Sequence, residues 1–270
     1  MNAQMLEPTL RPAPFPRRAT RTGRADLHFH LLPGVDDGPR SFDETLELAQ
    51  LACAEGTATV VATPHVRGDF MTDVSDLPDR VSDVRSLLEI EGLEMDVLVG
   101  GELGHDMVGR LDQAELDSIA QGPDGGRWLL VETPFTGFDA GFLAATGELR
   151  ARGFAVVLAH PERATGVLDD GCAALAAEVR AGSVLQLNAT SVTGLHGEAA
   201  RAAALELARR FACVLGSDAH GGVRAPALCA GLRGLIEESV HPRTAHAMID
   251  GGPRALVGEG LGASRSALAA

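Results

Sequence analysis

Lysine and tyrosine are both absent from this chain of 270 residues, so all 23 of its basic residues are arginine. A chain without lysine cannot form a Schiff base with pyridoxal phosphate, and it lacks the lysine with which a P-loop contacts nucleotide phosphates. A chain without tyrosine has no catalytic phenol. These absences exclude pyridoxal-phosphate enzymes, ordinary P-loop NTPases and protein kinases.

Cysteine and long apolar runs are also scarce. The four cysteines include no CxxC pair, and Cys53 and Cys213 lie within apolar runs, which predicts buried, reduced thiols in a cytoplasmic protein. No apolar stretch reaches the ~18 residues of a membrane span. The formal net charge of −14 makes nucleic acid and anionic lipid unexpected partners, because both attract basic surfaces.

The composition, 45% hydrophobic and 22% charged, is that of a globular protein with a sizeable core. Residues 1–24 are rich in arginine and proline and lack the apolar segment of a secretory signal, so we expect a disordered tail there. No low-complexity linker interrupts residues 25–258, which we expect to form one domain. A frayed C-terminal tail is expected at 259–270.

Short apolar runs alternate with longer helical patterns from residue 25 onward. Apolar runs of this kind are typical of strands covered on both faces, and seven of them, each followed by a helix, predict a parallel α/β protein. The clearest helix should begin after Ser41, with Glu44 as its capping-box partner, and end at Gly56. We expect strands at 25–30, 57–63, 95–100, 128–132, 154–159, 184–188 and 211–217, and helices at 42–55, 76–91, 112–120, 139–152, 172–181, 198–210 and 226–238.

Histidine is concentrated where these strands end. Five of the nine histidines occupy the last residue of a strand or the turn after it, and the strand at 95–100 is followed by a carboxylate, Glu102. Because side chains alternate along a strand, the two residues of an H-x-H or D-x-H pair point the same way. In closed α/β barrels the site lies at the C-terminal ends of the strands. The histidines are His28, His30, His65, His160 and His220, and Asp218 completes the second pair.

A metal site explains this clustering better than chance. A lone histidine at a strand end is more often a hydrogen-bonded loop residue than a ligand. Several imidazoles and carboxylates crowded at one end, however, would be costly without a counter-charge. Divalent cations remove that cost, and histidine with Asp or Glu but no Cys suits Mn²⁺, Zn²⁺ or Fe²⁺. The turn Asp36-Asp37-Gly38 could present one more carboxylate, with Gly38 supplying a positive φ.

Several motifs follow one another along the chain: HxH at 28–30, PGxDDG at 33–38, ATPH at 62–65, GE at 101–102, AHPER at 159–163 and SDAH at 217–220. The set as a whole is specific, although H-x-H alone would be weak evidence. It resembles the PHP (polymerase and histidinol phosphatase) superfamily and, within it, the bacterial manganese-dependent protein-tyrosine phosphatases of capsule and exopolysaccharide biosynthesis. The resemblance runs from residue 25 to about 258.

This resemblance implies a distorted (β/α)7 TIM-like barrel of PHP type that binds up to three divalent cations. Mn²⁺ is the expected ion, with Zn²⁺ or Fe²⁺ as alternatives. Asp37 is preferred to Asp36 as a ligand because it directly precedes the glycine, and His105 is either an extra ligand or a surface residue. The implied ligands are His28, His30, Glu102 and Asp218 at the first cation, Glu102 and His160 at the second, and Asp37, His65 and His220 at the third.

The resemblance also implies phosphate binding and a reaction. Arg163 and Arg224 match the two arginines with which such enzymes hold a phosphate, and a guanidinium fork fits two phosphate oxygens at once. Hydrolysis would proceed by attack of a hydroxide that bridges two cations, with Glu102 as the bridging ligand. The implied substrate is a tyrosine-phosphorylated protein in the cytoplasm, with the tail of a tyrosine kinase of a polysaccharide export system as one candidate.

Some polar residues receive supporting or structural roles. We expect Glu132 and Asn188, at strand ends, to form hydrogen bonds behind the ligands. His196, His241 and His246 are interpreted as structural. Trp128 is interpreted as a core residue.

Two alternatives remain open. The chain could be another PHP phosphoesterase, acting on a small monoester such as histidinol phosphate. It could also be a non-catalytic, metal-stabilised module that binds a tyrosine-rich tail. The complete ligand set argues against the binding module. The sequences of the AHPER and PGxDDG motifs are closer to those of the tyrosine phosphatases, which argues against the small-molecule enzyme.

Overall fold

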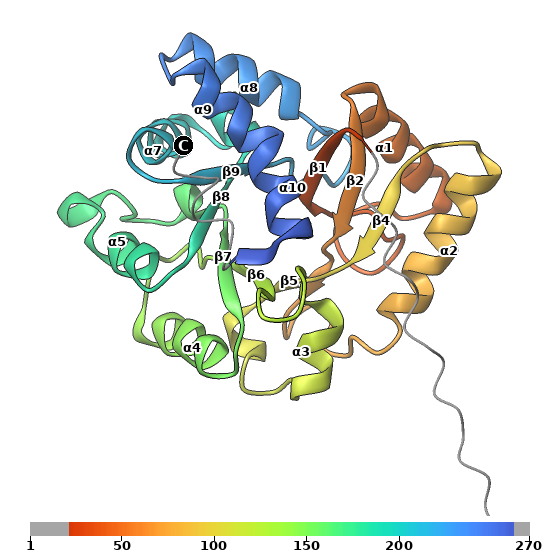
Figure 1. Ribbon diagram of the computed structural model, residues 1–270, viewed down its shortest axis with the longest axis horizontal. Coiled ribbons are helices and arrows are strands. Elements are labelled where there is room, and N and C mark those ends of the chain that lie inside the picture. Colours follow the sequence, from red (N-terminus) through yellow and green to blue (C-terminus); the bar gives the residue numbers. More distant parts are fainter. Residues whose placement is uncertain (1–21, 262–270) are drawn as a thin grey trace, which may run out of the picture.

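The computed structural model describes residues 22–261, and parallel strands lie at its centre with helices outside them (Figure 1). The tails expected at 1–24 and 259–270 lie outside the described residues, apart from 22–24 and 259–261. Among the helices that the structure describes, none combines the length and apolar character needed to cross a membrane.

The strands form two parallel sheets. Each sheet pairs neighbours in register through backbone hydrogen bonds, as Thr59 with Asp96 and Leu130 with Val157. The three-stranded sheet has the order β1 (Arg24–Phe29), β2 (Thr57–Ala62), β4 (Asp96–Val99), and the six-stranded sheet has the order β3 (His65–Val66), β5 (Glu102–Leu103), β6 (Trp128–Glu132), β7 (Ala155–Ala159), β8 (Val184–Asn188), β9 (Cys213–Gly216).

The chain passes from one sheet to the other at two breaks. Thr63-Pro64 separates β2 from β3, where proline has no N–H for a ladder, and Gly100-Gly101 separates β4 from β5. A Cβ on Gly100 would lie 2.4 Å from Cγ1 of Val61. At the other edge, Phe29 forms a parallel bridge with Ala219. The parallel α/β class is therefore confirmed, whereas the described strands form two sheets and no closed one.

The expected helices and strands are all present, and each ends within two residues of its expected bounds. The structure adds elements that the sequence pattern did not predict: two short strands, β3 and β5, three α-helices and three short 3₁₀ helices. The helices that follow the expected pattern are α1 (Phe42–Ala54), α2 (Leu77–Ile90), α3 (Gln113–Ile119), α4 (Ala140–Ala151), α5 (Ala173–Arg180), α7 (Glu198–Arg210) and α8 (Leu228–Glu237); the additional ones are α6 (Ala189–Val192), α9 (Pro242–Ile249) and α10 (Gly251–Gly258).

At the start of α1, the predicted N-cap is confirmed but the predicted capping box is not. The Ser41 hydroxyl accepts a hydrogen bond from the backbone N–H of Glu44, so Ser41 is the N-cap. The Glu44 carboxylate, however, accepts from the backbone N–H of Arg40 and pairs with its guanidinium. The expected capping box is wrong here because that neighbouring cation takes the carboxylate. A complete capping box occurs instead at α3, between Asp112 and Glu115.

Two apolar clusters lie on opposite sides of the strands. On β6, Leu129 and Val131 belong to the larger cluster beneath the surrounding helices, while Trp128 and Leu130 belong to a smaller inner cluster. This alternation follows from the two-residue period of a strand. Trp128 is fully buried, which confirms it as a core residue.

The inner face of the strands changes from apolar to polar along the strand direction. On β6 the inward positions run from Trp128 through Leu130 to Glu132, and on β8 they run from Val184 through Gln186. Helix α10 crosses the apolar end (Figure 1), where the Trp128 indole donates to the Leu256 carbonyl at 2.8 Å. The polar end is the C-terminal one.

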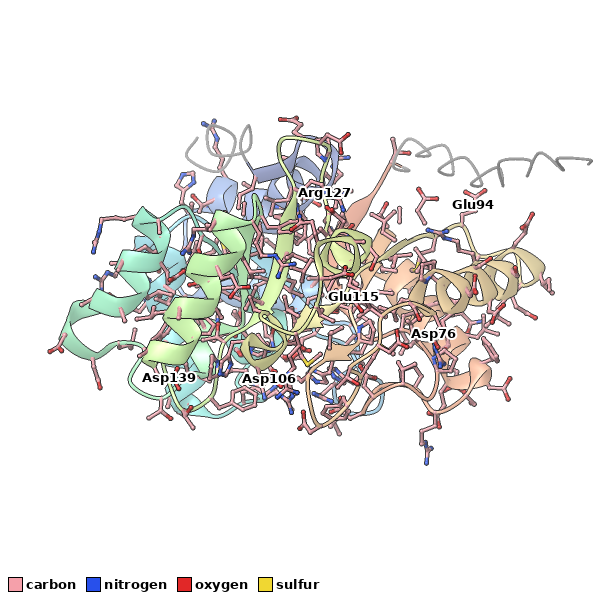
Figure 2. The ribbon with its side chains drawn as sticks, turned by 90° about the horizontal axis from the view of Figure 1, so that it is seen from below. Asp76, Glu94, Asp106, Glu115, Arg127 and Asp139 are labelled. Atoms are coloured by element: carbon pink, nitrogen blue, oxygen red, sulfur yellow. The ribbon has the colours of Figure 1, made fainter. Side chains whose placement is uncertain are left out.

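The two ends of the strands lie at opposite edges of the molecule. Figure 2 shows Arg127, just before β6, far from Asp106, which follows β5. The polar inner side chains therefore open toward the edge that carries the loops after each strand.

Candidate metal and phosphate site

Four buried side chains from β1 and the residue after it, from β5 and from the turn after β9 converge at this C-terminal edge. The Nε2 atoms of His28 and His30 lie 3.1 Å apart. Each Nε2 also lies 3.3–3.5 Å from Oε2 of Glu102 and from Oδ1 of Asp218. All four side chains are at most 3% exposed.

These separations fit the coordination shell of a cation. Ligands bound at about 2.0–2.1 Å in a tetrahedron have donor atoms about 3.3 Å apart. The donor atoms of His28, His30, Glu102 and Asp218 show that spacing. Two carboxylates and two imidazoles at this spacing match the donor set of a divalent cation.

The histidine rings are oriented by acceptors behind them. Nδ1 of His28 lies 2.7 Å from Oε1 of Gln186, and Nδ1 of His30 lies 2.7 Å from Oδ2 of Asp36. Nδ1 of His220 lies 2.9 Å from the backbone carbonyl of Asp218. Each acceptor favours a proton on Nδ1, which leaves the Nε2 lone pair free to point inward.

Glu102 joins this group to the other histidines. Its Oε1 lies 2.8 Å from Nε2 of His160, and its Oε2 lies 2.8 Å from Nδ1 of His65. Beyond His65, Oδ1 of Asp37 lies 3.1 Å from Nε2 of His220 and 3.4 Å from Nε2 of His65. Every residue predicted as a primary ligand thus lies in one of several overlapping groups whose donor atoms are within 4.8 Å of one another.

Several of these buried donor atoms lie near opposite charges but form no contact of hydrogen-bond geometry among the described residues. They include Oε2 of Glu102, Nδ1 of His65 and of His160, and Nε2 of His220. A buried polar atom without a partner is costly. Such atoms on the residues of the ligand groups suit coordination of a cation better than hydrogen bonding.

The backbone is also strained at this edge. His160 and Asp218 adopt left-handed conformations, with φ of +35° and +52°. A non-glycine residue in such a conformation costs about 1–3 kcal/mol, and strain of this kind concentrates at functional sites.

The carboxylates of the site raise the pKa of three of its imidazoles, those of His28, His30 and His65. Burial alone lowers the pKa of His65, but the nearby carboxylates of Asp37 and Glu102 outweigh burial and raise the pKa to about 9. The pKa of His30 is raised well above its usual value despite burial, through Asp218, Asp36 and Glu102. Burial likewise raises the pKa of Glu102, yet the facing histidines bring it well below its usual value. A cation would therefore have to displace protons to bind.

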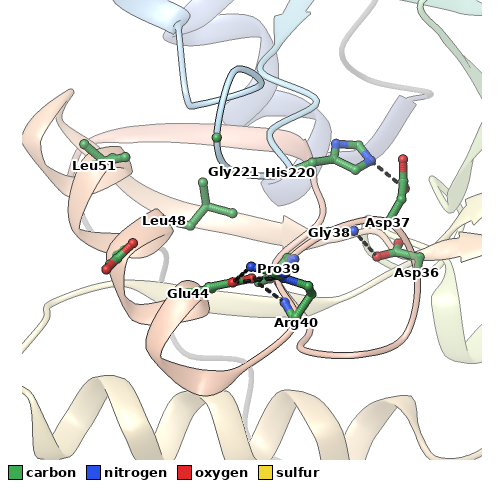
Figure 3. A pocket seen from close by; sticks show the side chains of 12 residues that line it. Asp36, Asp37, Gly38, Pro39, Arg40, Glu44, Leu48, Leu51, His220 and Gly221 are labelled. Atoms are coloured by element: carbon green, nitrogen blue, oxygen red, sulfur yellow. Dashed lines mark hydrogen bonds and ion pairs between the residues drawn. The ribbon is translucent and has the colours of Figure 1, made fainter.

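The turn after β1 places its two aspartates differently (Figure 3). Asp37 faces His220, whereas Asp36 accepts from the backbone N–H of Gly38 and orients the His30 ring. The positive φ expected at Gly38 is wrong, because Gly34 carries it, at +69°. Gly38 is instead limited by space, since a Cβ there would lie 3.1 Å from Cβ of His30. A cavity of about 580 Å³ extends from Asp37 and His220 along α1.

Both predicted phosphate-binding arginines reach the site. NH1 of Arg163 lies 3.3 Å from Oδ2 of Asp218, and its guanidinium stacks 4.6 Å from the ring centre of Phe135. Arg224 pairs with the Asp37 carboxylate. The two guanidinium groups therefore approach the ligand cluster from different loops.

The predicted supporting residues lie close behind the ligands. Asn188 donates from Nδ2 to Oδ2 of Asp218 at 2.6 Å. The Glu132 carboxylate accepts two hydrogen bonds from Arg67, at 2.7 and 2.9 Å, and shares a group with His65 and Glu102.

The remaining histidines divide into three surroundings. His105 lies in a short 3₁₀ helix against the Phe142 ring and outside the ligand groups found in the described chain. His241 caps α9, and His246 is half-exposed beside Asp250. His196 lies nearer the site than the sequence suggested: burial and then the charge of Arg163 lower its pKa to about 4.

Sequence reasoning missed three residues that shape the site: Gln186, Arg67 and Phe135. Gln186 could have been found, because it has the same strand parity as Asn188 two residues later. Arg67 follows His65 by two, but its pairing with Glu132 spans 65 residues and has no local signal. Phe135 is three residues past β6, where nothing in the sequence indicates its contact with Arg163.

The chain resembles known proteins over most of its length. The family model for capsular polysaccharide synthesis, CpsB/CapC, matches residues 24–255. The chain is 28% identical over 205 residues to the putative tyrosine-protein phosphatase CapC of Staphylococcus aureus, which covers 74% of this chain and 78% of that protein. It is 26% identical over 197 residues to the tyrosine-protein phosphatase YwqE of Bacillus subtilis, with coverage of 72% and 76%.

Solved structures agree with these relatives. A chain from the crystal structures of YwqE of Bacillus subtilis and CpsB of Streptococcus pneumoniae, described as unique metal-dependent tyrosine phosphatases, superposes with a TM-score of 0.69 at 25% identity. The match covers 83% of this chain and 93% of that one. A structure from the engineering of organophosphate hydrolysis on a lactonase template has a TM-score of 0.50 at 18% identity, a likeness of fold alone.

Proposed function

Because the chain belongs to the CpsB/CapC family of capsular polysaccharide synthesis, we propose that it is a metal-dependent phosphatase that removes phosphate from tyrosine residues of a protein. The observation that carries this proposal is the convergence of His28, His30, Glu102 and Asp218, whose donor atoms have the separations expected around one cation, with Arg163 beside them. The family relatives are named tyrosine-protein phosphatases, which favours this substrate over histidinol phosphate.

We assign the ligands to three divalent cations, with Mn²⁺ as the expected ion. His28, His30, Glu102 and Asp218 would hold the first, and Glu102 would share the second with His160. Asp37, His65 and His220 would hold the third. Asp36 stays behind the ligands, because its carboxylate is already engaged by His30 and by two backbone N–H groups. We also infer a distorted (β/α)7 barrel, since chain continuity and the Phe29–Ala219 bridge connect neighbouring strands around the site.

The bound cations would supply a water of lowered pKa and neutralise charge on the phosphoryl oxygens. The chain supplies the grip on the phosphate. Arg163 forms an ion pair with Asp218, and Arg224 forms one with Asp37. A phosphate dianion can replace these partners and accept a bidentate hydrogen bond from a guanidinium.

The phenolate leaving group needs little general-acid catalysis from the protein. A phenolate, whose conjugate acid has a pKa of about 10, departs with less help from a general acid than an alkoxide does. This agrees with a site whose histidines are oriented toward the cation positions by Gln186 and Asp36 rather than toward solvent. We propose a phosphotyrosine-bearing protein as the partner, with the tail of a capsule-system kinase as the first candidate.

A substrate panel tests this function. Wild-type protein with added Mn²⁺ should hydrolyse a phosphotyrosine peptide faster than phosphoserine peptides or histidinol phosphate. His28→Ala should lose this activity, whereas His246→Ala, at a half-exposed histidine outside the site, should retain it. Preferential hydrolysis of histidinol phosphate would support the small-molecule enzyme. Binding of the phosphotyrosine peptide without phosphate release would support the non-catalytic module.

A further inference from the structure

A second cavity adjoins the ligand cluster on the side of β5 and β6. Its volume is about 390 Å³, and Phe135 and Pro134 form its apolar wall. Gly68 and Gly104 also line it, so no side chain narrows it at those two positions. The other lining residues are Arg67, Asp69, His105, Asp106 and Glu132.

Phe135 connects this cavity to the phosphate-binding arginine. Its side chain is 46% exposed, yet its ring centre lies 4.6 Å from the Arg163 guanidinium and 5.7 Å from the His160 ring. The backbone holds it there, since Thr165 N–H donates to the Phe135 carbonyl at 2.9 Å. A phosphate gripped by Arg163 would therefore have its ester oxygen beside an ordered, partly exposed aromatic ring.

The charges of the cavity disfavour a second anion. The Arg67 guanidinium is shared between Asp69 and Glu132, with four hydrogen bonds of 2.7–2.9 Å. With Asp106 added, the lining carries three carboxylates against one guanidinium. Such a cavity suits a neutral group, and its apolar wall suits a flat one.

We propose that this cavity receives the aromatic ring of the phosphotyrosyl side chain, with Phe135 as the residue that selects an aryl over an alkyl phosphate ester. The inference rests on the proposed phosphatase function and names how that site would choose its substrate. Offset or edge-to-face contact with Phe135 stabilises a phenyl ring beyond simple burial. Phosphoserine has no ring to make this contact.

Paired phosphopeptides test the proposal. Two peptides of one sequence, carrying phosphotyrosine or phosphoserine at the same position, are assayed with Mn²⁺-loaded wild type, Phe135→Ala and Phe135→Tyr. Phe135→Ala should lower kcat/KM for the phosphotyrosine peptide about tenfold, the size of one aromatic contact, mainly through KM. The phosphoserine value and inhibition by inorganic phosphate should not change, and Phe135→Tyr should retain wild-type selectivity.

A matched control and an equilibrium measurement complete the design. Phe42→Ala removes a phenylalanine of equal exposure, 46%, that lines neither of the two cavities described here, and should leave selectivity unchanged. Binding of a non-hydrolysable phosphonate analogue of phosphotyrosine should weaken in Phe135→Ala in parallel with KM.

Two results would overturn the inference. Equal losses for both peptides and for inorganic phosphate would mean that Phe135 acts only by positioning Arg163. Unchanged kinetics in Phe135→Ala would mean that the aromatic ring of the substrate binds elsewhere. Failure of the proposed function looks different, because wild type itself would then hydrolyse neither peptide.

Discussion

Gln186 offers the sharpest test of how the fold prepares its ligands. This glutamine is fully buried on β8; its Oε1 lies 2.7 Å from Nδ1 of His28, and its Nε2 donates to Leu187 O at 2.8 Å and Asn188 Oδ1 at 3.0 Å. Gln186→Met keeps the length of the side chain and removes all three interactions. The His28 N–H then loses its acceptor, and the ring is free to move its proton to Nε2, the atom that we assign to the cation.

The magnitude follows from these contacts. A buried donor left without a partner costs about 1–3 kcal/mol, so with the two lost amide hydrogen bonds the metal-free protein should lose about 2–4 kcal/mol of unfolding free energy. Removing a residue that orients a metal-binding histidine lowers metal affinity about 10–100-fold. Affinity for Mn²⁺ should therefore fall by that factor in a protein that still folds.

Competition with a chelating dye measures the Mn²⁺ affinity, and denaturant unfolding of metal-free protein measures the stability. Gln121→Met is the matched control: Gln121 is also buried, but its amide donates to the carbonyls of Val99 and Ile119. It should lose stability and keep its Mn²⁺ affinity. A folded Gln186→Met protein with wild-type affinity would refute the reasoning.

Three further predictions concern the ligands and the phosphate grip. Arg163→Lys should lower kcat/KM for a phosphotyrosine peptide, with a loss of about 2–3 kcal/mol of transition-state stabilisation, because the planar guanidinium fork is lost. Metal content should not change. Wild-type kinetics would mean that this arginine has only a surface role. Glu102→Gln should reduce turnover ~10²-fold or more and release at least one metal; full activity with all metals retained would move the bridge to another residue. Because the pKa of His65 is raised to about 9 in the absence of a cation, protons compete with metal below that pH, so apparent Mn²⁺ affinity should rise about tenfold or more from pH 6.5 to pH 8. A titration with no pH dependence would contradict that competition.

The sequence predicted the elements and the edge at which the site lies, because both have local signals. Apolar runs with helical stretches between them indicated parallel strands, and the parity of His28 with His30 placed two side chains on one face. Where a residue's role depends on distant partners, the sequence was weaker. The motif resemblance favoured Asp37 over Asp36 as a ligand, but the contact of Asp36 with the His30 ring becomes visible only in the folded turn.

Other features depend on packing that has no local pattern. The break between β4 and β5 follows from the space beside Gly100, which Val61 fills from a neighbouring strand. Helix α10 covers the apolar end of the strands through Trp128 and Leu256, which are 128 residues apart. The acceptor of His28 lies 158 residues away, on β8. Such pairings become visible only in three dimensions.

The central claim is that cations held at this cluster drive phosphotyrosine hydrolysis. The most direct test measures phosphate release from a phosphotyrosine peptide by one preparation of wild-type protein, first stripped with a chelator and then supplied with Mn²⁺. We predict that stripping abolishes release and that Mn²⁺ restores it. Undiminished release by the metal-stripped protein would contradict the account.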